Sequence, residues 1–114
     1  MALPSPIPDP VVELIADRFR LLSEPMRVRA LDQLRGAGEA SVGEMADRLG
    51  TSQQNISKHL GVLHAAGVVA RRKDGNHVIY SIADDSVLAI CELVCGSIER
   101  RAGDLGALLA GASR

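Results

Sequence analysis

The sequence of 114 residues predicts a mostly α-helical fold with one small β-hairpin. Three observations lead to this prediction. Four segments before residue 68 repeat apolar residues at helical spacing, and only two residues separate the glycine that ends the third segment from the fourth. Two short runs joined by a turn sequence follow, and a last helical stripe comes after them. This order is that of a winged helix-turn-helix.

Length, charge and composition are those of one globular domain. A chain of 114 residues has room for a single modest core, and 46% of its residues are hydrophobic while the formal net charge is only −1. Any binding to nucleic acid must therefore depend on local charge. No apolar run has the length of a membrane span and the N-terminus does not have the pattern of a signal peptide, so we expect a cytoplasmic protein with two reduced cysteines.

The first helix is expected after a flexible N-terminal arm, residues 1–8, which contains three prolines. Asp9 is expected to cap this helix, with Pro10 at its first position. Its apolar stripe consists of Val11, Leu14, Ile15, Phe19 and Leu22.

The second and third helices have clear boundary signals. Pro25 begins the second, whose buried side is expected to be Val28, Leu31 and Leu34, and Gly36 and Gly38 end it. Ser41 and Glu44 have the spacing of a capping box at the start of the third helix, and Gly50 stops that helix. Its buried residues are expected to be Val42, Met45, Ala46 and Leu49.

The fourth helix follows Thr51 and Ser52, and Ser52 can cap it. Its apolar side is Ile56, Leu60 and Leu63. Gln54, Lys58 and Gly61 then lie on the opposite side, with Ser57 on the flank.

A hairpin is expected next, with strands 68–73 and 77–82 joined through Asp74-Gly75-Asn76 and with Val78, Tyr80 and Ile82 facing inward. Asp84 or Asp85 can cap the last helix. Its stripe is wider than a small domain needs, so a second copy could cover it; the stripe consists of Val87, Cys91, Val94, Cys95 and Ile98. The domain is expected to span residues 9–102, and residues 103–114 to be a C-terminal tail or the frayed end of this helix.

The start of the fourth helix carries side chains that can read bases in the major groove of DNA. In a helix-turn-helix the N-terminal part of the second helix reaches the base edges. The alternative is an ordinary solvated helix face. The candidate DNA-binding residues of this segment are Ser52, Gln53, Gln54, Asn55, Ser57, Lys58 and His59.

The hairpin adds positive charge to the same part of the chain. From Lys58 to His77 there are four formal positive charges and one negative, an excess of three. Basic side chains at a hairpin tip suit phosphates or a narrow minor groove. Alternatively, they protect an exposed strand edge from aggregation. The candidate DNA-binding residues here are Arg71, Arg72, Lys73, Asn76 and His77.

Three segments resemble the ArsR/SmtB family of repressors: 23–31 (SEPMRVRAL), 52–63 (SQQNISKHLGVL), and 66–69 (AGVV) with the hairpin ending at Tyr80. The resemblance covers roughly residues 10 to 100. It implies a homodimer through the first and last helices, usually a repressor that leaves its operator when a metal, metalloid or oxidant binds. It also implies that Gln53, Ser57 and His59 lie near DNA. Asn76 departs from the arginine of many relatives, which argues against strong insertion of the wing into the minor groove.

The ArsR/SmtB family has two kinds of metal site, and in this sequence other residues stand at most of the positions of their ligands. The segment from Ala40 to Glu44 has no cysteine at the positions of the thiolate site on the third helix. On the last helix Asp84 fits the opening position, but Ser86, Ser97 and Arg100 occupy the places of the further ligands.

Cys91 and Cys95 remain as a candidate metal site, because an i, i+4 pair lies on neighbouring turns of one helix face. Two thiolates could share a soft ion with a further ligand from a partner chain or from the N-terminal arm. The other interpretation is that both cysteines only pack as small hydrophobic residues. A metal or metalloid ion is thus a candidate effector, and no cofactor is expected to be required for folding.

An enzyme is not expected, since the sequence has no phosphate-binding glycine loop, nucleophile motif or cluster of carboxylates. Two rival functions stay open. The domain could bind another protein in place of DNA, although Gln54, Lys58 and Gly61 offer no apolar anchor. It could also depend on a co-encoded partner protein for sensing.

Overall fold

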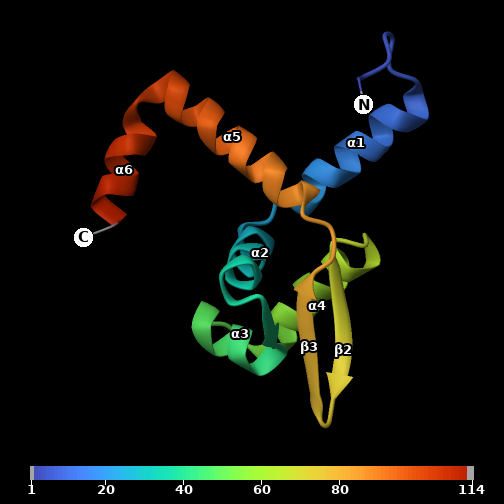
Figure 1. Ribbon diagram of the computed structural model, residues 1–114, viewed down its shortest axis with the longest axis vertical. Coiled ribbons are helices and arrows are strands. Elements are labelled where there is room, and N and C mark those ends of the chain that lie inside the picture. Colours follow the sequence, from blue (N-terminus) through green and yellow to red (C-terminus); the bar gives the residue numbers. More distant parts are fainter. Residues whose placement is uncertain (1, 113–114) are drawn as a thin grey trace. The chain divides into compact units, whose positions relative to one another are not determined.

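The computed structural model describes residues 2–112 and confirms the mostly helical architecture with a small sheet (Figure 1). The chain divides into two compact units, Met1–Asp84 and Asp85–Arg114. The first unit contains α1 (Asp9–Leu21), α2 (Pro25–Ala37), β1 (Glu39–Ser41), α3 (Val42–Leu49), α4 (Gln53–Ala65), β2 (Val69–Asp74) and β3 (His77–Ile82). The second contains α5 (Ser86–Ala102) and α6 (Asp104–Ala112).

The boundaries of α2, α3 and α4 follow the local signals of the sequence. Pro25 opens α2, and Gly38 closes it with a φ of 82°. Ser41 and Glu44 form the capping box of α3, with both bonds at 3.1 Å. Gly50 ends α3 in the left-handed region, where a glycine has no Cβ to clash.

The expected cap of α1 was wrong by one residue. Asp9 is the first helical residue and Pro8 is the cap, because the Pro8 carbonyl already accepts bonds from the amides of Val11 (2.9 Å) and Val12 (3.0 Å). At α5, Asp85 occupies the cap position but its side chain forms no capping bond.

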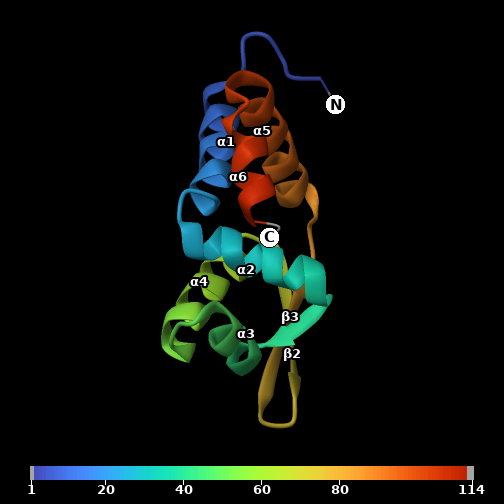
Figure 2. The same ribbon diagram turned by 90° about the vertical axis from the view of Figure 1, so that its left-hand side faces the viewer.

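The sheet has three antiparallel strands in the order β1-β3-β2. The β2–β3 hairpin closes where Asp74 faces His77, and Gly75 adopts a φ of 61° in the two-residue turn. In both Figures 1 and 2 the tip of this hairpin extends beyond α3 and α4. The hairpin is therefore the wing of the fold.

The core of the first unit lies between α2, α3, α4 and the sheet. Residues from each of these helices, from the first position of β2 and from the position before it have at most 2% of their surface exposed, and they include Leu31, Leu34, Met45, Ile56, Leu60, Leu63, Val68 and Val69. Tyr80 of β3 is 3% exposed, as its inward position predicted. Val28 was expected to be buried but is 36% exposed, and Ala30 is the buried residue of that turn.

The helices α1 and α5 leave much of their apolar surface uncovered. On α1, Leu14 is 64% exposed and Phe19 is 51% exposed. On α5, Val94 and Ile98 are 45% and 49% exposed, although Val87 is fully buried. Within residues 2–112, no helix combines the length and the apolar character that a membrane span needs.

The chain forms a further helix, α6, where the sequence analysis expected a tail or the frayed end of the last helix. Gly103 adopts a φ of 66° and ends α5. The residues that follow are good helix formers, among them Ala107, Leu108, Leu109 and Ala110, so a new helix begins after the glycine.

Candidate nucleic-acid interface

The turn between α3 and α4 is held by two of the polar residues that the sequence offers for DNA contact. The Ser52 hydroxyl accepts a bond from the Asn55 amide at 3.0 Å, which caps α4. The Asn55 side chain donates from Nδ2 to Oγ1 of Thr51 at 2.9 Å. Ser52 and Asn55 therefore fix the start of α4, and their side-chain groups are already bonded within the chain.

Four other polar residues of α4 have exposed side chains. Gln54 and Lys58 lie on the side of α4 away from Ile56, which is fully buried, and Gln53 and Ser57 lie on its flanks. Gly61 continues this face, and no atom of the chain lies within 4 Å of the place that a Cβ would take. The first two turns of α4 thus present donors and acceptors on a surface of low bulk, as the sequence predicted.

His59 does not belong to this exposed face. Its side chain is only 7% exposed, and its Nδ1 lies 3.3 Å from Nη1 of Arg27 on α2. Position 59 is three residues after the buried Ile56 and one before the buried Leu60, so it lies on the inner flank of the helix. The family resemblance implies that His59 lies near DNA, whereas the structure packs its side chain into the domain.

The three basic residues of β2 divide between the two faces of the wing. Arg71 pairs with Tyr80 and Lys73 with Val78, and residues paired across antiparallel strands share a face. Arg72 pairs with Ile79 on the other face. There its guanidinium lies 2.9 Å from the Glu39 carboxylate and 3.7 Å from that of Asp74.

Two hollows join the wing to the helix-turn-helix. One, of about 420 Å³, is lined by Ser57 of α4 together with Arg71, Arg72 and Lys73. The other, of about 550 Å³, is lined by Gln53 of α4 together with Asn76 and His77 near the hairpin tip. The fold therefore brings two separate candidate segments, the start of α4 and the wing, to a common concave surface.

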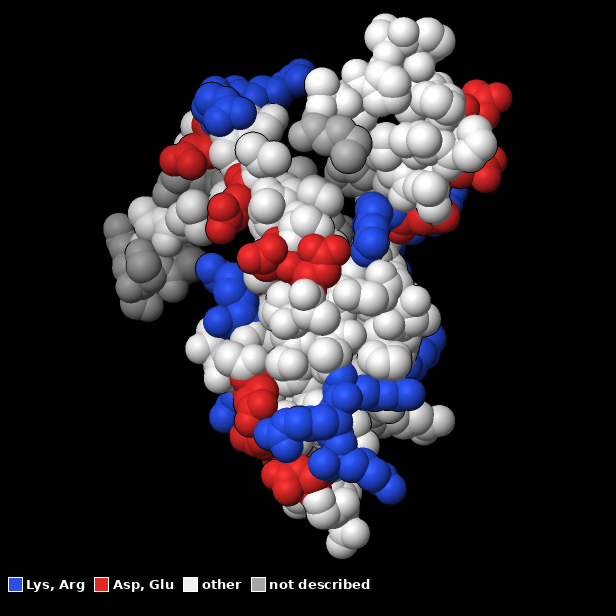
Figure 3. All heavy atoms as spheres, turned by 45° about the vertical axis from the view of Figure 1, so that its right-hand side comes forward, with Lys and Arg blue, Asp and Glu red and all other residues white. Residues whose placement is uncertain are grey.

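The basic side chains of this surface differ in whether they form ion pairs. In Figure 3 the Lys and Arg side chains gather over the hairpin, with Asp and Glu side chains beside them. Among residues 2–112, Lys58, Arg71 and Lys73 form no ion pair, whereas Arg72 forms two. Arg71 and Lys73 lie on the face of the wing that carries the buried Tyr80, and all three basic residues of β2 border the hollow that contains Ser57.

Glu44 is an acidic residue of this surface and lines the hollow that contains Gln53. The backbone amide of Ser41 donates to its carboxylate and lowers its pKa from the ordinary value, and the charges of Arg48 and His77 act in the same direction. The carboxylate is therefore ionised at neutral pH and is committed to capping α3.

The two cysteines of α5 differ in environment. Cys91 is half-buried, and this burial raises the pKa of its thiol above the ordinary value. Cys95 is exposed. Among the described residues, no three His, Cys, Asp or Glu side chains are grouped closely enough to hold a metal ion.

Sequence reasoning missed two parts of this surface. The strand β1 places Glu39 across β3 from Arg72, and a run of three residues is too short to show an alternating pattern. Arg27 was noted only within the family segment, yet it contacts His59. The only local signal near Arg27 is Pro25, which predicts the start of a helix.

Comparisons with known proteins agree with this geometry. Residues 22–72 match the family described as "Helix-turn-helix domain". An uncharacterised HTH-type transcriptional regulator of Mycobacterium tuberculosis, Rv0081, is 38% identical over 102 residues, which are 89% of this chain and 89% of that protein. Its crystal structure matches with a TM-score of 0.73 over 85% of this chain and 97% of that chain.

Two further matches carry family names. The HTH-type transcriptional repressor SmtB of M. tuberculosis is 36% identical over 71% of this chain and 59% of the repressor. The homodimeric winged helix-turn-helix DNA-binding domain of Mb0332 from Mycobacterium bovis, described as a possible ArsR-family regulator, is 26% identical, with a TM-score of 0.71 over 90% of this chain and 94% of that one. These relatives are transcription regulators and not enzymes, in agreement with the sequence analysis. The chain therefore belongs to the ArsR/SmtB family of winged helix-turn-helix transcriptional regulators.

Proposed function

We propose that this regulator is a repressor that binds an inverted-repeat operator as a homodimer and leaves it on a metal, metalloid or thiol-reactive signal. Residues 9–102 form the DNA-binding and dimerisation domain, and residues 1–8 are an arm outside it. The DNA-facing residues are Gln53, Gln54, Ser57 and Lys58 on α4 and Arg71, Lys73, Asn76 and His77 on the wing.

One observation carries this proposal: exposed Ser57 of α4 shares a hollow with Arg71 and Lys73 of the wing, which form no ion pair within residues 2–112, and exposed Gln53 shares a second hollow with Asn76 and His77. Glutamine, serine and lysine can bond to base edges or phosphates, and they stand where a helix-turn-helix meets the major groove. Lys58, Arg71 and Lys73 are free to neutralise phosphates, because they form no ion pair within the described chain. His59, which is buried, and Arg72, which forms ion pairs, contribute less to contacts with DNA.

A homodimer accounts for the exposed apolar residues of α1 and α5. A hollow of about 510 Å³ on α1 is lined mainly by apolar side chains, including Leu14, Ile15 and Leu21. Phe19 and Ile98 are about half exposed in a single copy. A second copy would cover these surfaces, and its two-fold symmetry would place the two α4 helices at half-sites roughly 10 bp apart. The Mb0332 domain that this chain resembles is homodimeric.

The signal is proposed to act at Cys91 and Cys95. Their i, i+4 spacing on α5 lets both sulfurs reach one soft ion, with a further ligand supplied from outside the helix. Exposed Cys95 would bind first, because the raised pKa of the Cys91 thiol lowers the amount of its thiolate at neutral pH.

Selection of duplexes from a random DNA pool tests the DNA function, because the pool assumes no operator sequence. We expect an inverted repeat with half-site centres about one duplex turn apart. Gln54→Ala should relax the selected sequence, whereas Lys58→Ala should weaken binding to all sequences. No enrichment at low salt would contradict DNA binding and favour a domain that binds another protein.

Titration of the reduced protein on the selected duplex tests the signal. Arsenite, cadmium, zinc and nickel are added separately while DNA binding is followed by fluorescence anisotropy. We expect at least one of them to release the parent and none to release the double variant Cys91→Ser, Cys95→Ser. An equal response of the two proteins would rule out the thiol site and leave the DNA function intact.

A further inference from the structure

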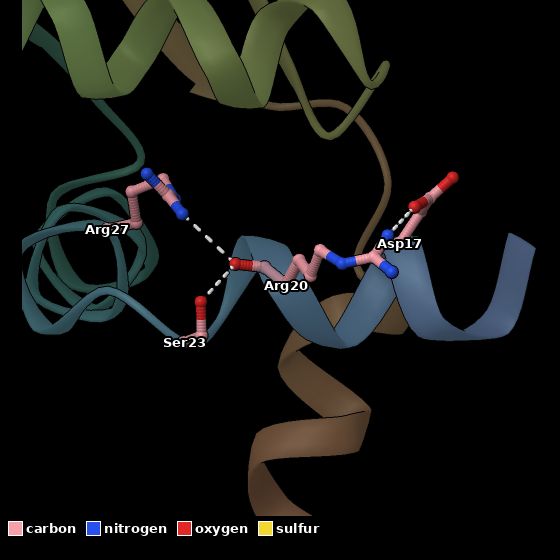
Figure 4. A network of polar contacts seen from close by, with 4 residues as sticks. All are labelled: Asp17, Arg20, Ser23 and Arg27. Atoms are coloured by element: carbon pink, nitrogen blue, oxygen red, sulfur yellow. Dashed lines mark hydrogen bonds and ion pairs between the residues drawn. The ribbon is translucent and has the colours of Figure 1, made fainter. Parts of the chain in front are cut away.

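Arg27, in the first turn of α2, holds the end of α1. Its Nε donates to the Leu21 carbonyl at 2.8 Å and its Nη2 to the Arg20 carbonyl at 3.0 Å. Figure 4 shows the guanidinium pointing at the Arg20 carbonyl, which also accepts a bond from the Ser23 hydroxyl at 2.7 Å. Both carbonyls belong to the last turn of α1, where helix carbonyls have no partner within the helix.

The same guanidinium also reaches α4. Its Nη1 lies 3.3 Å from Nδ1 of His59. An arginine can only donate, so Nδ1 of His59 is the acceptor of this bond in the tautomer that leaves that nitrogen without a proton. His59 directly follows Lys58, which means that this contact lies behind the exposed face of α4.

A second bond joins the same two helices independently. Arg18 of α1 donates from Nη1 to the carbonyl of Ala66, the C-cap of α4, at 3.2 Å. The middle of α4 is thus linked to α1 through Arg27 and its end through Arg18. Because a guanidinium is planar and presents its donors in a fixed fork, the Arg27 link resists changes in the angle between the helices.

We infer that Arg27 is a positioning residue that sets the angle of α4 relative to α1 through His59. This inference rests on the proposed function, in which α1 contributes to the dimer interface and α4 reads DNA. The link then fixes how the two α4 copies are spaced for one operator, and a signal that moves α1 reaches the DNA-facing side of α4 by the same route.

Arg27→Lys tests the inference because it keeps the charge but loses the three-pronged contact. We expect affinity for the selected operator to fall roughly fivefold or more, the size of a typical coupling between sites. Affinity for random-sequence DNA at low salt should not change, because charge is conserved and Arg27 does not face the DNA. Arg29→Lys is the control on the same helix, since Arg29 is exposed and forms no ion pair within residues 2–112. Equal losses on operator and random DNA would overturn the inference.

Substitutions at His59 separate positioning from direct contact. His59→Asn keeps an acceptor near the place of Nδ1, and His59→Leu removes it. We expect the asparagine variant to retain more operator affinity, and we expect Arg27→Lys to add little loss to His59→Leu. Fully additive losses would mean that His59 acts on DNA by itself, and they would contradict the proposed link.

Amide hydrogen exchange tests the link without any DNA. In Arg27→Lys we expect faster exchange in α4 around His59 and in the last turn of α1, with α3 unchanged. Unchanged exchange in α4 would overturn the inference even if operator binding fell. If the parent binds no duplex at all, the proposed function fails, and the exchange data still decide whether Arg27 holds α4.

Discussion

Replacing Arg71 and Arg72 one at a time compares two neighbouring cations that differ in partners. Arg71 is exposed and unpaired within the described chain, whereas Arg72 lies 2.9 Å from Glu39 and 3.7 Å from Asp74. Arg71→Ala should remove one phosphate contact from each copy of the dimer. Arg72→Ala should remove little, because its charge is already balanced.

The magnitude follows from counterion release. Each phosphate contact contributes about 0.9 to the slope of log affinity against log salt, so two lost contacts should lower the slope by about 1.8. The ratio of the affinity of the parent to that of Arg71→Ala should therefore fall about 12-fold when the salt concentration rises from roughly 50 to 200 mM.

Fluorescence anisotropy on the selected duplex over that salt range measures both slopes. The account predicts a clear drop in slope for Arg71→Ala and a change well below that for Arg72→Ala. Equal drops in slope for the two variants, or a larger drop for Arg72→Ala, would refute the prediction that Arg71 contacts a phosphate and that the charge of Arg72 is balanced within the chain.

Three other predictions concern stability and assembly. Gly61→Ala should raise the free energy of unfolding by about 0.5–1 kcal/mol in urea, because a mid-helix glycine is costly and the added methyl meets no atom; a loss of stability would contradict this. The lowered pKa of Glu44 stabilises the fold above the ordinary carboxyl pKa of 4.5, and that contribution is lost as the pH falls through the folded-state value. Glu44→Gln should therefore lose less stability than the parent between about pH 6 and pH 3, and parallel curves would argue against the charged cap. Ile98→Glu should weaken the dimer in sedimentation equilibrium by about tenfold or more, a cost of roughly 1.4 kcal/mol, while Leu3→Glu in the arm should not; equal effects would remove α5 from the interface.

The features that the sequence predicted correctly depend on neighbouring residues. The capping box at Ser41, the cap at Ser52 and the hairpin turn at Gly75 each need only a few residues along the chain to form. Such signals also fix the order of elements, which is why the fold class could be recognised. The exposed residues at the start of α4 follow directly from its helical period.

The features that the sequence did not predict depend on residues far apart in the chain. Glu39 meets Arg72 only because β1 and β2 flank the same central strand. The helical period places His59 on the inner flank of α4, but no residue near it in the sequence indicates that it contacts Arg27. A contact across 32 positions leaves no local pattern in a single sequence.

Mapping of backbone amide shifts by NMR, with the selected duplex added to labelled protein, tests the central claim most directly. The account predicts that the largest shifts fall on residues 53–58 of α4 and 71–77 of the wing, with small shifts on the exposed side of α2. Large shifts on α2 with none at the start of α4 would contradict the claim that this face enters the groove.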